Sequence, residues 1–376
     1  MDDSVKINRG LKGVYFERSG VSHIDGKAGE LLYRGYSIHD LATHASFEEV
    51  SYLLIHGELP TQSELDAFSS QMGKASLPQE MAGILGALKD AHPMVALRTG
   101  VSALAGLEAG AADASEEGFL KNGTRLMAQV PQIIAMHHAL REGREVKTWR
   151  SDLSVAGNWL WMLKGEEPSA EATRLADVDF VLHAEHGANA SAFAARVTVG
   201  TEADIHGAIT TGIATLAGPA HGGAAEDVMK MVEEIGSPEN AAAYVKAKRA
   251  NREAVTGFGH RVYRAEDPRA RHMRDGVQKL SQEMGQPQWY EILQAVVEAM
   301  KPYSRHGLNV NVDFYSGVIY QLHGIPMDLY VPIFAIGRMP GWIIQCLEQR
   351  RQNILIRPLT LYNGPEQRPW TPIADR

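Results

Sequence analysis

A histidine in a glycine-rich turn is the first residue of this sequence whose surroundings suit chemistry. His221 lies in the run Gly-Pro-Ala-His-Gly-Gly at 218–223, and a helical pattern follows it. A histidine at a helix N-terminus feels the positive end of the helix dipole, which favours the neutral imidazole. A neutral imidazole can polarise a carbonyl group without carrying charge itself. The alternative is a loop histidine beside a helix cap.

Two further residues could transfer protons. His260 closes the turn Gly-Phe-Gly-His at 257–260 and could act as a general acid beside a bound anion. The alternative for His260 is a capping or solvent-facing histidine. Asp313 precedes an aromatic pair, which could desolvate the carboxylate enough to make it a base. The alternative for Asp313 is an N-cap on the helical pattern that follows it.

Positive charge gathers around the turn that holds His260. Between residues 246 and 274, nine Lys and Arg outnumber three acids, so this window carries +6 in a chain of −8. Gly257 and Gly259 lie inside the window, and glycine lets backbone N–H groups approach a phosphate closely. The pattern indicates an anion site for a phosphorylated small molecule, and a solvated helix face is the alternative.

Two arginines near the C-terminus raise a second possibility of anion binding. Arg338 stands inside an apolar run, and Arg357 lies between Ile356 and Pro358. Each arginine either extends to the surface or pairs with a buried anion. Together they could bind the carboxylates of a small polyacid in bidentate fashion.

Metal and nucleotide motifs are weak. His183 and His186 are three residues apart at the end of a helical pattern, so a metal pair on one helix face is conceivable. No third ligand has a recognisable spacing, so we expect no metal site. There is no Walker A sequence, and no glycine fingerprint follows a strand.

Length and composition exclude several classes of protein. The 376 residues suggest two or three domains, and the single cysteine, Cys346, excludes a disulfide framework. No long apolar run lacks a charge, and residues 1–4 begin an acidic N-terminus without a signal peptide. The mild acidity argues against general nucleic-acid binding. We therefore expect a cytoplasmic protein that binds neither membrane nor nucleic acid.

The elements that must position these residues are mostly helices. Asp25-Gly26 predicts a hairpin at the front of the chain, and helical signals dominate after residue 40. Four helix starts are predicted from capping signals, and the helix that follows the last of them, a serine–proline pair, runs to Ala250. These starts are Ser46 with Glu49, Thr61 with Glu64, Ser169, and Ser237-Pro238. Gly337 and the pair Pro340-Gly341 are expected to interrupt the apolar segment 331–347. The fold class is therefore mostly α with a small N-terminal β element.

Taken together, the motifs resemble the citrate synthase family, in order and in spacing. The resemblance rests on segments 183–191, 218–223, 257–269, 311–317 and 356–358, and a similar region at 24–60 extends it over nearly the whole chain. It implies a two-domain helical enzyme that works as a homodimer. The large domain would comprise 1–221 and 326–376, and the small, closing domain 222–325.

The implied reaction condenses acetyl-CoA with oxaloacetate and hydrolyses the citryl-CoA thioester. By resemblance, Asp313 would be the base, His221 the donor to the thioester oxygen, and His260 the acid for the oxaloacetate carbonyl. The oxaloacetate carboxylates would be bound by His186, Arg269, Arg338 and, from the other subunit, Arg357. The CoA site would include Gly257, Phe258, Gly259, Arg264 and Arg305. CoA is here an acyl-carrying substrate, and no separate cofactor or metal is implied.

The sequence departs from the family pattern at one loop. Asn309-Val310 stands where the family usually has an aromatic–proline pair, which affects loop stiffness and acyl-chain preference. The N-terminus lacks the added domain that carries NADH inhibition in some relatives, so we expect no such regulation.

Three other functions compete with the citrate synthase interpretation. The nearest is 2-methylcitrate synthase, because one methylene changes binding by only about 1–3 kcal/mol. The others are a non-catalytic CoA-binding homologue and a metal-dependent hydrolase using His183 and His186, which a chelator would inactivate.

Overall fold

The computed structural model describes residues 5–376, so the acidic start at 1–4 lies outside the described residues. This part of the chain contains sixteen α-helices and one three-stranded sheet, which confirms the expected fold class. No helix among the described residues is long and apolar enough to cross a membrane.

The predicted hairpin forms the small sheet. Its antiparallel strands are β1 (Ser22–Asp25), β2 (Glu30–Tyr33) and β3 (Tyr36–Ser37), in the order β1-β2-β3. Asp25 closes the first turn because its Oδ1 accepts the backbone N–H groups of Lys27 and Ala28, at 2.8 and 2.9 Å.

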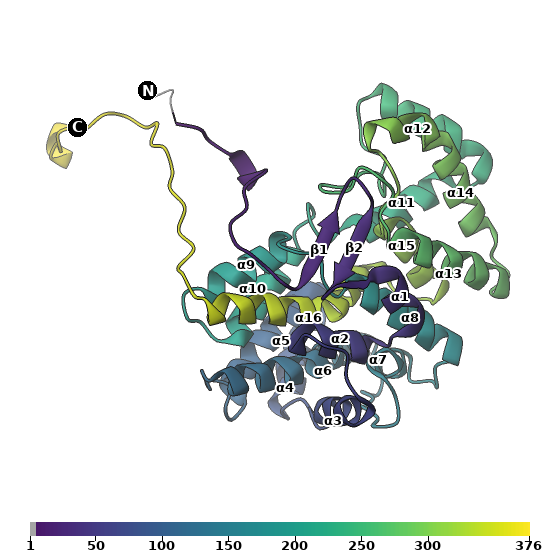
Figure 1. Cartoon of the computed structure of the whole chain (residues 1–376), viewed down its shortest axis with the longest axis horizontal. Helices are drawn as coiled ribbons and strands as arrows, with labels where there is room; N and C mark the ends of the chain where they lie inside the picture. The colour runs from purple at the N-terminus through teal and green to yellow at the C-terminus, as the bar shows by residue number, and fades with distance from the viewer. Residues whose placement is uncertain (1–4) are drawn as a thin grey trace.

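The first ten helices make up most of one side of the molecule in Figure 1. They are α1 (Ile38–His44), α2 (Phe47–His56), α3 (Gln62–Gly73), α4 (Glu80–Ala87), α5 (Pro93–Leu107), α6 (Glu116–Arg141), α7 (Val155–Lys164), α8 (Ala170–His183), α9 (Ala190–Val199) and α10 (Ile205–Leu216). The next five gather at the other side: α11 (Ala224–Ile235), α12 (Ala241–Ala250), α13 (Ala270–Glu283), α14 (Gln288–Met300) and α15 (Asp313–Leu322). The last helix, α16 (Tyr330–Arg351), returns to the first group and packs against α6, α8, α9 and α10.

Most helix starts follow the sequence. Both capping boxes form, at Ser46 before α2 and at Thr61 before α3, and Ser169 caps α8 through the backbone N–H of Ala172. The prediction at Ser237 was wrong in detail. Its side chain makes no cap hydrogen bond, and the short 3₁₀ turn η2 (Pro238–Asn240) precedes α12.

The expected interruption of the apolar segment 331–347 was also wrong. Helix α16 continues through Gly337, Pro340 and Gly341. The glycines serve close packing instead: a Cβ on Gly337 would lie 3.2 Å from the Cα of Phe180 in α8. Tertiary packing therefore overrides the local helix-breaking signal here.

Both ends of the described chain extend away from the helical body (Figure 1). The segment 5–20 is exposed and precedes β1, and 352–376 follows α16 as an almost wholly exposed extended chain. Large apolar side chains on these segments lie open to solvent, including Tyr15, Leu359 and Trp370 at 99, 86 and 77 % exposure. We call these two segments the terminal arms.

Candidate active site

The loop after α8 positions His186. Helix α8 ends at His183, and Tyr33 of β2 holds the next peptides: its hydroxyl donates to the Glu185 carbonyl at 2.8 Å. His186 is buried, and its Nε2 lies 3.1 Å from the hydroxyl of Tyr263. His183 and His186 therefore do not share a helix face. Among residues 5–376, no group of three His, Cys, Asp or Glu is placed to bind a metal.

His260 faces His186, with ring centroids 5.1 Å apart. Its Nδ1 accepts the backbone N–H groups of Val262 and Tyr263, at 3.0 and 3.2 Å. We therefore assign the proton of the neutral ring to Nε2. Burial, and after it the positive charge of Arg269, lowers the pKa of His260 to about 4. At neutral pH His260 is thus an uncharged donor through Nε2–H.

His221 is the second neutral donor. Its Nε2 lies 2.8 Å from Ser191 Oγ and accepts the Ser191 backbone N–H at 3.3 Å, so we assign its proton to Nδ1. Burial, and after it Arg338, lowers the pKa of His221 to about 4. The expected neutral state agrees with this value, and His221 lies in the turn before α11, which begins at Ala224.

Asp313 is the first residue of α15 rather than its N-cap. Val312 occupies the cap position and makes no side-chain cap hydrogen bond. Burial raises the pKa of Asp313, while electrostatic interactions with His183 and Arg269 oppose that rise. A desolvated carboxylate binds a proton more tightly than one in water, so Asp313 is suited to act as a base.

Two buried arginines give the site its positive charge. Arg269 pairs with Asp267 through Nε–Oδ1 and Nη2–Oδ2 hydrogen bonds of 2.9 and 2.7 Å. Arg338 donates from Nε to the His183 carbonyl at 2.5 Å and lies over the ring of Phe334. Its buried Nη1 has no hydrogen-bond partner within residues 5–376, so the site is suited to an anion.

The glycine turn is held by the loop that contains Asn309 and Val310. Gly257 and Gly259 have φ values of +82° and +90°, which favour glycine. The Gly259 N–H donates to the carbonyl of Asn309 at 2.8 Å, and Phe258 forms a β-bridge with Val310. Backbone pairing thus fixes the approach to Asp313.

The structure brings together most of the predicted residues, but not all. One cluster contains His186, His260 and Arg269. A second cluster contains His221, Arg338 and Phe334. Asp313 lies within electrostatic reach of Arg269 and Arg338. Three of the predicted residues have exposed side chains: Arg264, Arg305 and Arg357. Arg357 lies on the C-terminal arm, beyond the end of α16, and does not join the cluster in its own chain.

Sequence reasoning missed four residues of the site. Ser191 forms a hydrogen bond with His221, and Tyr263 forms one with His186. Asp267 forms an ion pair with Arg269. The ring of Phe334 contacts His221 and Arg338. A signal existed for one of them: Asp267 is two residues from Arg269, and a buried arginine needs a nearby carboxylate. The contacts of the others join segments far apart in sequence or depend on packing.

Comparison with known proteins identifies the family of the chain. The family described as "Citrate synthase, C-terminal domain" matches residues 10–359. Citrate synthase 2 of Bacillus subtilis is 43 % identical over 371 residues, covering 98 % of this chain and 99 % of the relative. 2-Methylcitrate synthase 2 of Corynebacterium glutamicum is 40 % identical over 378 residues, covering 98 % of each.

A solved structure shows the same fold. The ternary complex of citrate synthase from Thermoplasma acidophilum with carboxymethyl coenzyme A and oxaloacetate superposes with a TM-score of 0.92. The two chains are 29 % identical, and the match covers 99 % of this chain and all of that one. The chain therefore belongs to the citrate synthase family and is an enzyme, an acyltransferase of the citrate (Si)-synthase type.

Proposed function

We propose that this enzyme condenses acetyl-CoA with oxaloacetate and hydrolyses the resulting citryl-CoA to citrate and CoA. The observation that carries the proposal is one site with two neutral histidines and a desolvated carboxylate. His221 presents Nδ1–H, His260 presents Nε2–H, and Asp313 is the base. The relative from Thermoplasma acidophilum, whose structure holds oxaloacetate and a CoA derivative, supports this choice of substrates.

The first step needs a base and a hydrogen-bond donor at the same acetyl group. Asp313 removes a proton from the methyl carbon, and the electron pair moves onto the thioester oxygen. That oxygen gains charge, and the Nδ1–H of His221 stabilises the resulting enolate by a hydrogen bond. A neutral imidazole suits this role. The acidity of its N–H is closer to that of the enol O–H than the acidity of an imidazolium is.

The second step forms the carbon–carbon bond. The enolate carbon attacks the carbonyl carbon of oxaloacetate, and the Nε2–H of His260 protonates the carbonyl oxygen. Water then cleaves the thioester, releasing CoA and leaving the third carboxylate of citrate. Neither histidine needs to be charged beforehand, since both pKa values are about 4.

We propose that the carboxylates of oxaloacetate bind to His186, Arg269, Arg338 and Arg357. The first three side chains surround the site from buried positions in this chain. The fourth, Arg357, would come from the partner of a homodimer. The exposed apolar side chains of the terminal arms support a second copy of the chain as their partner, because such side chains gain most from burial.

We propose that CoA lies at Gly257, Phe258 and Gly259, with Arg264 and Arg305 close to its phosphates. A cavity of about 160 Å³, lined by Phe258, Leu308 and Asn309 among others, opens beside this turn. The exposed arginines suit flexible, solvated phosphate groups. We further propose that 222–325 closes over a large domain formed by 1–221 and 326–376, and that the enzyme works in the cytoplasm.

The test measures CoA release with a thiol reagent. Oxaloacetate is added with acetyl-CoA and, separately, with propionyl-CoA, each against a control without oxaloacetate. We expect release that depends on oxaloacetate and a higher kcat/KM for acetyl-CoA. A higher value for propionyl-CoA would assign 2-methylcitrate synthase, the activity of the Corynebacterium relative. Release without oxaloacetate would identify a thioesterase, and no release would leave a CoA-binding protein.

A further inference from the structure

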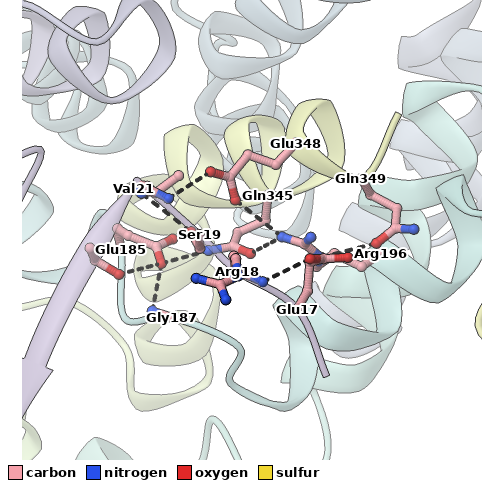
Figure 2. Close-up of polar contacts among 12 residues, drawn as sticks. Glu17, Arg18, Ser19, Val21, Glu185, Gly187, Arg196, Gln345, Glu348 and Gln349 are labelled. Atoms are coloured by element: carbon pink, nitrogen blue, oxygen red, sulfur yellow. Dashed lines mark hydrogen bonds and ion pairs between the residues drawn. The ribbon is translucent and has the colours of Figure 1, made fainter. Parts of the chain in front are cut away.

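A fully buried carboxylate lies next to the candidate substrate site and has no role in the chemistry above. Glu185 precedes His186, and its Oε1 accepts three hydrogen bonds, from the hydroxyl of Ser22, the amide of Gln345 and the backbone N–H of Gly187. Figure 2 shows Glu185 and Gly187 at one end of a polar network that continues through Gln345. One oxygen of this carboxylate is therefore saturated with donors.

The other oxygen of Glu185 has no partner among the described residues. Its Oε2 is buried and unbonded, and so is Nη1 of Arg338. Both side chains approach Gly341 of α16: a Cβ there would lie 2.7 Å from Oε2 and 3.2 Å from Cδ of Arg338. The two nevertheless form no ion pair within residues 5–376. A buried anion and a buried cation thus lie close together, each with an unused atom.

Ligand binding changes the charge balance around this carboxylate. Four titratable or charged groups surround the Glu185 carboxylate. They are Tyr33 and Arg34 from the β2 side, Arg338 from α16, and the neighbouring His186. A dicarboxylate bound to Arg338 would bring new negative charge towards Glu185. Two carboxylates that share one cation in a buried site are not both readily ionised.

We infer that Glu185 is the proton acceptor of the substrate site: it takes a proton from solvent onto Oε2 when oxaloacetate binds to Arg338. This inference rests on the proposed function. Glu185 touches no reacting atom, so it is a positioning residue that keeps the carboxylate pocket close to electrical balance. Oxaloacetate binding is therefore coupled to the uptake of up to one proton.

The proton affinity of Glu185 suits this role. Burial raises its pKa to about 7, and Arg338 and the hydrogen bonds to Oε1 oppose the rise. The bound dianion raises this pKa further, so binding is strongest below pH 7 and weakens as pH rises from 7 towards the pKa of the complex. The neighbours do not titrate in that window: burial raises the pKa of Tyr33 to about 12, that of Arg338 is about 10, and that of His186 lies well below its usual value.

The experiment measures the Kd of oxaloacetate by titration calorimetry from pH 6 to pH 9, in two buffers of different ionisation enthalpy. We expect a constant Kd below pH 7 and a rise above it that approaches tenfold per pH unit. The buffer difference should report net proton uptake at pH 8. Glu185→Gln removes the titrating group, so its Kd should be nearly independent of pH and lower than that of the wild type at pH 9.

A matched control uses a second carboxylate of the same network. Glu348 accepts the backbone N–H of Gly20 at 3.0 Å and a bond from Arg196 at 3.3 Å, and Figure 2 shows it in the same network. Glu348→Gln should keep the pH dependence of the wild type. Equal loss of that dependence in both variants would show a general disturbance and overturn the assignment to Glu185.

A second variant covers the case in which Glu185→Gln does not fold. Ser22→Ala removes one donor from Oε1 and leaves the carboxylate in place, so the pH at which Kd begins to rise should move upwards. A wild-type Kd that is flat from pH 7 to 9, without proton uptake, overturns this inference alone. No oxaloacetate binding at any pH overturns the proposed function and this inference with it.

Discussion

Replacing Gly341 by alanine tests whether the loop that carries His186 must keep its position. Gly341 lies in α16, directly against the loop after α8. A Cβ added there would lie 2.2 Å from the carbonyl oxygen of Ala184. Because real Cβ contacts below 3.0 Å essentially do not occur, the loop would have to withdraw by roughly 1 Å.

The effect on activity should exceed the effect on stability. Overpacking a tight site costs about 1–3 kcal/mol, and the better helix propensity of alanine offsets about 1 kcal/mol of that loss. We therefore expect the free energy of unfolding to fall by about 0–2 kcal/mol. A displacement of about 1 Å in a positioned group can lower the rate about 100-fold. The kcat/KM for oxaloacetate should fall by about that factor.

The assay compares Gly341→Ala with a glycine in open space. Gly83 lies in α4, and a Cβ added to it would have no atom within 4 Å, so Gly83→Ala should gain about 0.5–1 kcal/mol and keep its activity. CoA release gives kcat/KM, and urea unfolding gives stability. Unchanged kcat/KM in a folded Gly341→Ala enzyme would refute the reasoning, because the loop could then move without affecting the site.

Three other perturbations address the proposed roles directly. Asp313→Ala should abolish CoA release while calorimetric binding of oxaloacetate stays nearly intact; retained turnover would exclude Asp313 as the base. Ser191→Ala removes a contact of 2.8 Å to Nε2 of His221 and should lower kcat about tenfold with little change in the KM of oxaloacetate. An equal loss in a Thr198→Ala enzyme would argue for a general packing effect instead. On the acid side, kcat/KM should fall as pH drops through the raised pKa of Asp313 and through about 4, where His221 and His260 gain protons. Full activity at pH 4 would contradict this pH profile.

Local signals in the sequence predicted local structure well. The hairpin at Asp25 and the capping boxes at Ser46 and Thr61 each depend on residues within four positions, and all three form. The break expected at Pro340 failed because burial of α16 on nearly all sides outweighs the local cost of a proline. Local patterns report the backbone's preference, and packing decides where the two differ.

The candidate site was predictable only where a motif carried it. His221, His260 and Asp313 stood out because glycine or aromatic residues surround them. The neutral state expected for His221 agrees with its lowered pKa. Burial and Arg338 lower that pKa, and a single sequence cannot show that Arg338 lies nearby. Glu185 was visible only as a residue between two histidines, since its partners Ser22 and Gln345 are far away in the sequence.

The C-terminal arm has a consequence for genetics. On the proposed dimer, each site combines Asp313 of one chain with Arg357 of the other. An Asp313→Ala chain and an Arg357→Ala chain would each form an inactive homodimer. Their mixed dimer would contain one site with both defects and one site with none. Coexpression of two inactive genes should therefore restore activity, up to half that of the wild type in each mixed dimer, and would show by complementation that the arm crosses to its partner.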